Sequence, residues 1–333
     1  MSEDVIIAEG LTKVFNSHLT AVDHVNFSVK HGEIFGFLGP NGAGKTTTIN
    51  MLITILKPTE GKASVLGFDV AHQAYDVRNV VGVVPQEYTA DEDLTGIENI
   101  LLCADLYGIP RNTAKERAAD LLKLVELTDF ADKKVQTFSG GMRRRLELAC
   151  GLVNRPNVLF LDEPTLGLDV QTRTATWNYI RTLKKEYGMT LFMTTHYLEE
   201  ADALCDRIAI IDHGKIVVVG PPEELKHSLG GDVITLGIKG ETDVTELVQQ
   251  VDNVKDVKKE NGSYRIKAES GEVTAPLIIE ALRRAGFTVT KLSLTEPTLN
   301  EVYLEYTGKS MRDVEESREA FASQRMTMQR ARR

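Results

Sequence analysis

The fold is decided by a glycine-rich stretch, Gly39-Pro40-Asn41-Gly42-Ala43-Gly44-Lys45-Thr46-Thr47. The apolar residues 33–38 before it predict a buried strand, and residues 47–56 after it predict a helix. Between a strand and a helix, the glycines let successive backbone N–H groups point inward, and the helix N-terminus adds positive partial charge. The stretch therefore predicts a phosphate-binding loop for a nucleoside triphosphate, in which Lys45 reaches the β- and γ-phosphates and the Thr46 hydroxyl holds Mg²⁺.

The composition and the cysteines limit the class of protein. The 333 residues suffice for roughly two domains, and the 42% hydrophobic content supports a buried core. A net charge of −9 argues against a protein that binds nucleic acid over its whole surface. The cysteines, Cys103, Cys150 and Cys205, are odd in number and lack metal-type spacing, which is typical of packed thiols in a reducing cytosol.

The sequence shows no targeting or membrane-spanning segment. Residues 1–4 lack the positive and apolar regions of a secretory signal. No run of about eighteen apolar residues, the length that a transmembrane helix needs, occurs in the sequence. We therefore expect a cytoplasmic protein without a transmembrane helix.

Hydrophobic patterns change along the chain and predict an α/β architecture. Residues 5–38 alternate in short runs typical of antiparallel strands, whereas residues 96–153 have the apolar spacing of helices and predict a helical subdomain. Apolar runs at residues 158–161 and 189–193 flank a helix predicted over residues 172–186. This alternation predicts a layered α/β fold around a mostly parallel sheet.

A second, smaller domain is predicted beyond Gly230-Gly231. The pattern there has the order β-α-β-β-α-β, with Asn261-Gly262 as a tight hairpin turn, which is the ferredoxin-like arrangement of an α+β domain. The last twelve residues carry only basic charge, and we expect a flexible, solvated end, with contact to anionic lipid as the alternative. The expected parts are residues 1–228 with a helical subdomain at about 87–155, residues 229–308, and the charged tail 309–333.

Two carboxylates, Asp162 and Glu163, directly follow the apolar run at residues 158–161. Ligands bind at the carboxyl edge of a parallel sheet, so both side chains should lie beside the phosphate loop. We expect Asp162 to position the Mg²⁺ shell, and Glu163 to orient and polarise the water that attacks the γ-phosphate. A solvated acidic turn is the alternative.

Gln86 and His196 also follow predicted strands. The amide of Gln86 could reach the metal or the attacking water, and the alternative is an ordinary loop residue. His196 could bond the γ-phosphate and hold the attacking water, and the alternative is a structural histidine with satisfied hydrogen bonds. Both functional interpretations depend on the neighbouring motifs.

Ser139, Gly140 and Gly141 precede the helical run at residues 142–153 and allow two interpretations. Serine is a favoured N-cap, so the motif could simply begin a helix. A capped helix N-terminus with flanking glycines is also an anion-binding site. Because one chain does not need two cradles for the same phosphate, we expect this second cradle to serve the ATP of another copy.

Taken together, these motifs resemble those of the ATP-binding-cassette (ABC) ATPases. The resemblance covers residues from about 5 to 225 and implies the family's fold, a head-to-tail dimer and two ATP sites at the dimer interface. The family's adenine-stacking aromatic maps onto Phe15, where tyrosine is more typical and phenylalanine lacks the hydroxyl. The motifs are residues 39–46, Gln86, Ser139-Gly140-Gly141-Met142, Leu161-Asp162-Glu163, Leu168-Asp169 and His196.

Variant positions within the motifs resemble a subfamily, the drug- and antibiotic-export ATPases of the daunorubicin-resistance type. Met142 followed by Arg143-Arg144-Arg145 is one such feature, and the ending Glu296-Pro-Thr-Leu-Asn-Glu-Val-Tyr-Leu304 is another. The resemblance implies the ATPase subunit of a membrane exporter, peripheral on the inner face of the cell membrane, that docks a separate transmembrane permease near residues 86–94. It also implies ATP and Mg²⁺ as cofactors, and a homodimer that ATP closes and hydrolysis reopens.

Two other classes of protein fit the motifs less well. A soluble ABC ATPase that acts on nucleic acid or the ribosome usually carries tandem cassettes or a long coiled-coil insertion, and this acidic chain has one cassette and no sustained heptads. A phosphate-loop kinase or GTPase has no use for Ser139-Gly140-Gly141, and the Asn-Lys-x-Asp guanine motif is absent. We therefore expect no nucleic-acid partner. The sequence does not specify the transported substrate.

Overall fold

The chain divides into two compact units, Met1–Val219 and Gly220–Arg333. The computed structural model describes residues 4–16, 18–229, 231–239, 243–260, 263–295 and 297–309. Four features named in the sequence analysis lie outside the described residues, namely Gly230, the Asn261-Gly262 turn, Glu296 and the charged tail beyond residue 309.

The N-terminal strands form an antiparallel sheet, as their alternating pattern predicts. Residue pairs such as Ile6 and Val29 fix the register of the first two strands, and both residues face the core. The strand order is β2-β1-β4-β5, with β1 at Asp4–Phe15, β2 at Leu19–Lys30, β4 at Glu60–Val65 and β5 at Phe68–Asp69.

A six-stranded sheet forms the centre of the first unit, and the described neighbours β9-β3-β8-β7-β6 run parallel. Parallel strands are covered on both faces, which explains why their sequences are continuous apolar runs instead of alternating ones. The carboxyl ends of these strands lie at one edge. The strand order is β10-β9-β3-β8-β7-β6, with β3 at Ile34–Leu38, β6 at Val81–Val84, β7 at Val158–Asp162, β8 at Thr190–Thr195, β9 at Arg207–Asp212 and β10 at Lys215–Gly220.

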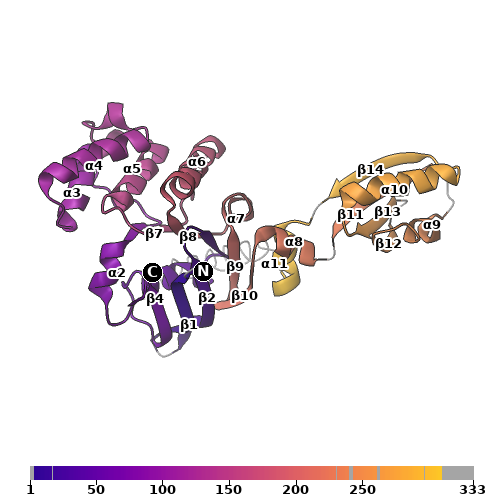
Figure 1. Cartoon of the computed structure of the whole chain (residues 1–333), viewed down its shortest axis with the longest axis horizontal. Coiled ribbons are helices and arrows are strands. Elements are labelled where there is room, and N and C mark those ends of the chain that lie inside the picture. Colours follow the sequence, from indigo (N-terminus) through magenta and orange to yellow (C-terminus); the bar gives the residue numbers. More distant parts are fainter. Residues whose placement is uncertain are drawn as a thin grey trace, which may run out of the picture. The chain divides into compact units, whose positions relative to one another are not determined.

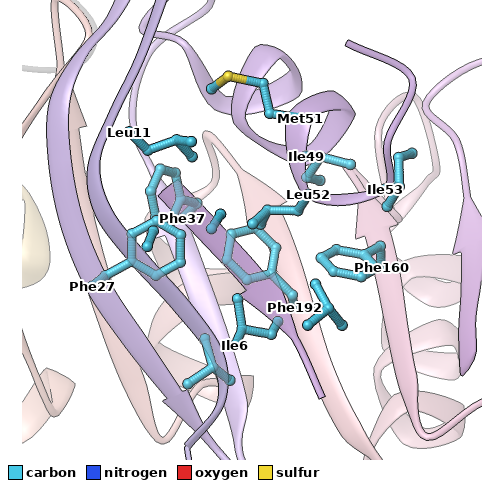
Figure 2. Packing of buried hydrophobic residues seen from close by; sticks show 14 of the residues in the cluster. Ile6, Leu11, Phe27, Phe37, Ile49, Met51, Leu52, Ile53, Phe160 and Phe192 are labelled. Atoms are coloured by element: carbon cyan, nitrogen blue, oxygen red, sulfur yellow. The ribbon is translucent and has the colours of Figure 1, made fainter. Parts of the chain in front are cut away.

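An aromatic core joins the two sheets of the first unit. Phe27 of the antiparallel sheet packs against Phe37 of the parallel sheet, with ring centroids 5.1 Å apart, and Phe160 and Phe192 are 5.5 Å apart. Ile49 and its helical neighbours cover these rings (Figure 2). A buried phenylalanine contributes about 3–5 kcal/mol relative to alanine, so this cluster fixes the strands whose ends carry the site.

The three helices α3, α4 and α5, which follow β6 and precede β7 in the sequence, pack against one another (Figure 1). They lie within residues 96–153, for which the sequence predicts a helical subdomain. Thr95 begins the first of them with a capping box that Glu98 completes. The α-helices of the first unit are α1 (Lys45–Leu52), α2 (Ala74–Val80), α3 (Gly96–Leu106), α4 (Arg111–Leu124), α5 (Gly140–Leu152), α6 (Val170–Tyr187) and α7 (Leu198–Leu204).

The second unit contains the ferredoxin-like element order that its sequence predicts. Its sheet is antiparallel with the order β12-β13-β11-β14, and Ile234, Tyr264 and Ile278 lie in a core of its own. Helix α8 (Pro222–Ser228) packs against α11 (Leu299–Thr307), which places α8 in this unit although the sequence predicts a boundary after residue 228. The other elements are β11 (Asp232–Ile238), α9 (Thr245–Gln249), β12 (Val254–Glu260), β13 (Ser263–Ala268), α10 (Gly271–Arg284) and β14 (Val289–Thr295).

Within the part of the chain that the structure describes, every helix is too short or too polar to span a bilayer.

Candidate functional site

The glycine-rich loop connects β3 to α1 at the carboxyl edge of the parallel sheet. Gly42 and Gly44 have φ angles of 73° and 109°, which side chains rarely adopt. A Cβ at Gly39 would lie only 2.2 Å from the Ile211 carbonyl oxygen. Gly44 is also the N-cap of α1 and has no capping side chain. The loop therefore presents backbone and a helix N-terminus, which is the chemistry that a phosphate group needs.

Lys45 is buried and its ammonium group lies inside the loop. The Nζ atom donates to the carbonyl oxygens of Gly39 (2.6 Å) and Pro40 (3.3 Å). It is also 3.0 Å from Oε1 of Glu163, in an ion pair whose two side chains are both about 95% buried. The structure therefore brings the phosphate loop and the predicted hydrolytic carboxylate together.

Asp162 ends β7 and receives hydrogen bonds from two hydroxyl groups. Thr46 donates to its Oδ1 atom over 3.2 Å, and Thr194 of the neighbouring strand donates to the same atom. Burial raises the pKa of Asp162, although these hydrogen bonds oppose the shift. No group of three His, Cys, Asp or Glu side chains among the described residues could bind a metal by itself. Thr46 and Asp162 supply two oxygens of the kind that Mg²⁺ accepts, and phosphate and water usually supply the others.

Glu163 is held at its backbone and at both carboxylate oxygens. Its φ angle is 49°, and its N–H donates to the carbonyl and the hydroxyl of Thr194. His196 Nδ1 lies 2.6 Å from Oε2, while Lys45 holds Oε1. Burial raises the pKa of Glu163, but the hydrogen bond with His196 and the charge of Lys45 outweigh it and lower the pKa. Glu163 is therefore an ionised carboxylate at neutral pH.

Gln86 and Phe15 lie apart from this cluster. Gln86 follows β6 at the same sheet edge, but its side chain is exposed and makes no hydrogen bond with the described residues. Phe15 ends β1, with the Nζ atom of Lys13 5.3 Å from its ring centroid. Neither side chain touches Lys45 or Glu163 in the described contacts.

Ser139, Gly140 and Gly141 form a second cluster at the start of α5. The Ser139 hydroxyl caps the helix by accepting from the Met142 N–H over 3.3 Å. A Cβ at Gly141 would lie 2.5 Å from Cγ2 of Thr172, so the start of α5 packs closely against α6.

Asp169 lies in this second cluster. It is the N-cap of α6 and accepts from the N–H and the hydroxyl of Thr172, the residue that Gly141 approaches. The predicted residues thus fall into two clusters. The first contains Lys45, Thr46, Asp162, Glu163 and His196, and the second contains Ser139, Gly140, Gly141 and Asp169.

The sequence analysis assigns no role in the site to three side chains that organise it. Thr194 bonds both Asp162 and Glu163, and the buried Arg144 and Glu147 of α5 bond the loops around them. The sequence did carry a signal for the last two, because ionic residues interrupt the buried face of a helix. Such residues are almost never buried unless they are paired.

Comparison with known proteins connects this arrangement to a family. A family model described as ABC transporter matches residues 22–166, and one described as ATP-binding protein DrrA1-3-like, C-terminal domain, matches residues 220–307. The doxorubicin resistance ATP-binding protein DrrA of Mycobacterium tuberculosis is 38% identical over 91% of this chain and 93% of its own length. The chain belongs to the ABC transporter ATP-binding proteins. The predicted family resemblance is therefore confirmed, and with it ATP as the ligand.

Two other ABC proteins show how far the likeness extends. The Nod factor export ATP-binding protein I of Ralstonia nicotianae is 43% identical over 70% of this chain and 72% of its own length. The ATP-binding cassette MJ0796, solved as a dimer in a post-hydrolysis state with ADP and Pi, is 27% identical, covers 65% of this chain and 98% of its own, and has a TM-score of 0.59. As an ABC subunit, the chain is an ATPase whose hydrolysis is coupled to transport.

Proposed function

We propose that this chain powers a membrane exporter through a head-to-tail homodimer that closes around two ATP molecules. The observation that carries the proposal is the separation of two anion-binding helix ends within one chain. In the first cluster, Lys45 at the start of α1 contacts Glu163, which directly follows β7, whereas Ser139 and Gly141 lie at the start of α5 against α6. Two copies arranged head to tail would bring the first cluster of one against the second cluster of the other. The names of the relatives, with drug resistance and export among them, support export.

In this proposal the first cluster performs the hydrolysis. Lys45 would hold the β- and γ-phosphates. Thr46, Asp162 and Gln86 would hold Mg²⁺, which when bound would neutralise phosphate charge. Glu163 orients and polarises the attacking water, because it is ionised and fixed at both oxygens. His196 keeps Glu163 in position and bonds the γ-phosphate. Gln86 would have to turn inward from its exposed position to reach the metal or the water.

The second cluster and Phe15 complete the proposed nucleotide site. Ser139, Gly140 and Gly141 would bond the γ-phosphate of the partner's ATP through the capped N-terminus of α5. Asp169 keeps α6 in place beside them. Phe15 would stack on the adenine ring of the ATP held by its own loop.

The proposed partner beyond the second copy is a separate transmembrane permease. The chain would dock it near residues 86–94 and lie on the inner face of the cell membrane. We propose residues 229–308 as an accessory domain that supports dimerisation or regulation, with the tail 309–333 as a flexible end. A role with nucleic acid or the ribosome is not favoured, since the relatives are resistance and export proteins.

Glu163→Gln tests the proposed function. The amide keeps the shape of the side chain but cannot polarise water as a carboxylate does, so we expect steady-state ATP hydrolysis to fall by about 100-fold or more. ATP binding should persist, and an ATP-bound dimer should accumulate in size-exclusion chromatography. Retained hydrolysis, or a monomer at saturating ATP, would contradict the proposal.

A further inference from the structure

Glu147 lies on α5, two turns beyond Ser139, and it is about 98% buried. Its carboxylate accepts three hydrogen bonds from the loop that follows β6. The backbone N–H groups of Thr89 and Ala90 donate to Oε1, and the Thr89 hydroxyl donates to Oε2 over 2.8 Å. A buried carboxylate with that many donors is a strong anchor, because removing it would leave two backbone N–H groups without their partner. The loop is therefore bound to α5 just after Gln86.

Arg144 anchors the same loop just before Gln86. Its buried guanidinium donates to the carbonyl oxygen of Pro85 over 2.6 Å. The other donors reach the carbonyl oxygens of Asp162 (3.1 Å), Glu163 (2.8 Å) and Pro164 (2.7 Å). Burial lowers the pKa of Arg144, and the carbonyl dipoles and nearby carboxylates compensate the charge.

The span between these two anchors contains Gln86, Glu87 and Tyr88. The Tyr88 hydroxyl donates to the Gly140 carbonyl oxygen at the start of α5 over 3.3 Å, so a third contact ties the span to the same helix. Helix α5, which Ser139 caps, therefore binds the loop on both sides of Gln86 and also binds the backbone carbonyl group of Glu163. A displacement of the loop would move α5 with it.

We propose that Glu147 and Arg144 are positioning residues for ATP hydrolysis, which fix the Gln86 loop to α5 and fix α5 to the peptide of Glu163. Neither side chain touches the reacting atoms. They act by holding Gln86 within reach of the site and by moving it together with Ser139. The proposal rests on the proposed function, because it assigns these residues to the same hydrolytic site.

The experiment compares Glu147→Leu with Glu147→Gln in the purified full-length chain. Leucine fills a similar volume without an acceptor, whereas the glutamine carbonyl can accept both N–H bonds and its amide can donate to the Thr89 hydroxyl. We expect Glu147→Leu to lower kcat by about 10- to 100-fold, the loss typical of misplaced catalytic groups, with KM for ATP changed less than about threefold. Glu147→Gln should restore most of kcat.

The matched control is Glu33→Leu. Glu33 is also a buried glutamate that accepts a backbone N–H bond, from Lys30, and it precedes β3 at the opposite edge of the sheet from Glu163. Both leucine variants should lower the thermal midpoint, but only Glu147→Leu should lower kcat. Arg144→Lys should resemble Glu147→Leu, since one ammonium cannot reproduce the guanidinium fork.

Three results would overturn the inference. They are an unchanged kcat in Glu147→Leu, no rescue by Glu147→Gln, and an equal loss of kcat in Glu33→Leu. If Glu147→Leu fails to fold, Thr89→Val removes the hydroxyl bond at an exposed position and should lower kcat by about threefold, and an unchanged kcat there would equally overturn it. Glu163→Gln run alongside separates the two proposals. If it stays active, the proposed function fails, whereas if it is inactive and Glu147→Leu is normal, only the positioning role fails.

Discussion

At the scale of the residue, two buried glutamates of the first unit have opposite pKa shifts. Burial raises the pKa of both. At Glu163 the hydrogen bond with His196 and the charge of Lys45 reverse the effect, so its pKa is lowered. At Glu200 burial has the largest effect, and the pKa stays raised. The hydrogen bonds with Thr195, Thr165 and Trp177, and the charge of Arg173, lower the pKa but do not outweigh burial. The two glutamates differ in direct contacts, because Lys45 forms an ion pair with Glu163, whereas the groups that donate hydrogen bonds to Glu200 are neutral.

These shifts predict opposite pH dependences of stability. Glu163 stabilises the fold above its unfolded pKa, and this contribution is lost as the pH falls through its lower folded pKa. Glu200 costs stability as the pH rises from the unfolded pKa to its higher folded pKa. Urea unfolding of Glu163→Gln and Glu200→Gln at several pH values measures both. At neutral pH, Glu163→Gln should be less stable than the unsubstituted chain, and this difference in the free energy of unfolding should disappear in acid. The stability of Glu200→Gln relative to the unsubstituted chain should increase as the pH rises. Stability differences that do not change with pH, or that change in the same way for both variants, would contradict the two pKa shifts.

The sequence predicts the residues of the first cluster better than it predicts their partners. The loop motif and the strand-end carboxylates bring Lys45, Glu163 and His196 together, because their strands are parallel neighbours. Gln86 has the right strand end but an exposed side chain, since the rotation of a loop residue is not encoded by its spacing. The sequence places Arg144 only in a subfamily pattern and does not predict its role, because the carbonyl groups that it binds come from loops distant in sequence.

At the scale of the element, two helix starts have similar caps in different surroundings. Ser139 caps α5 and Thr95 caps α3, each through a hydroxyl that accepts the N–H three residues on. The caps differ in that α5 begins beside α6 in the second cluster. Helix caps therefore serve stability at both places and, in our proposal, nucleotide binding at only one.

Ser139→Ala and Thr95→Ala separate these two roles. Loss of either cap should lower the free energy of unfolding by about 1 kcal/mol. Only Ser139→Ala should also lower steady-state ATP hydrolysis, because only α5 is proposed to face the partner's ATP. Denaturant unfolding and an ATPase assay on both variants give the comparison. Equal ATPase rates in the two variants would remove Ser139 from the composite site.

Element boundaries follow from side-chain contacts that the hydrophobic pattern does not contain. The helix predicted over residues 172–186 begins earlier, at Val170, because Asp169 caps it. The strand predicted at residues 189–193 extends to Thr195, because the polar Thr194 bonds Asp162 and Glu163 in the interior. Apolar periodicity locates an element, whereas caps and buried hydroxyls decide where it ends.

At the scale of the whole molecule, the two units have separate hydrophobic cores. Phe192 and its neighbours form one, and Ile234 and its neighbours form the other. The α/β order and the ferredoxin-like order were both predictable, since each follows from local patterns. The division at Val219 was not, because it depends on the packing of α8 against α11, which are far apart in sequence.

Separate cores predict that the second unit folds independently. A fragment of residues 220–309 retains α8, α11 and the whole core around Ile234. It should unfold in one cooperative thermal transition, as small domains with their own core do. Circular dichroism measures the transition, and a fragment beginning at residue 230, without α8, provides the comparison with lower expected stability. A non-cooperative melt of the longer fragment would show that its core needs the cassette.

The ammonium group of Lys45 can bind an anion only by exchanging one of its present contacts. An ammonium group has three hydrogens, and here Gly39, Pro40 and Glu163 accept them. An anion that binds this ammonium group must therefore replace one of these three acceptors, because each N–H bond of the group already has one. The measured affinity for the anion therefore reflects the difference between the contacts that Lys45 loses and those that it gains. Substitutions that weaken the contacts of Lys45 within the protein should increase that affinity.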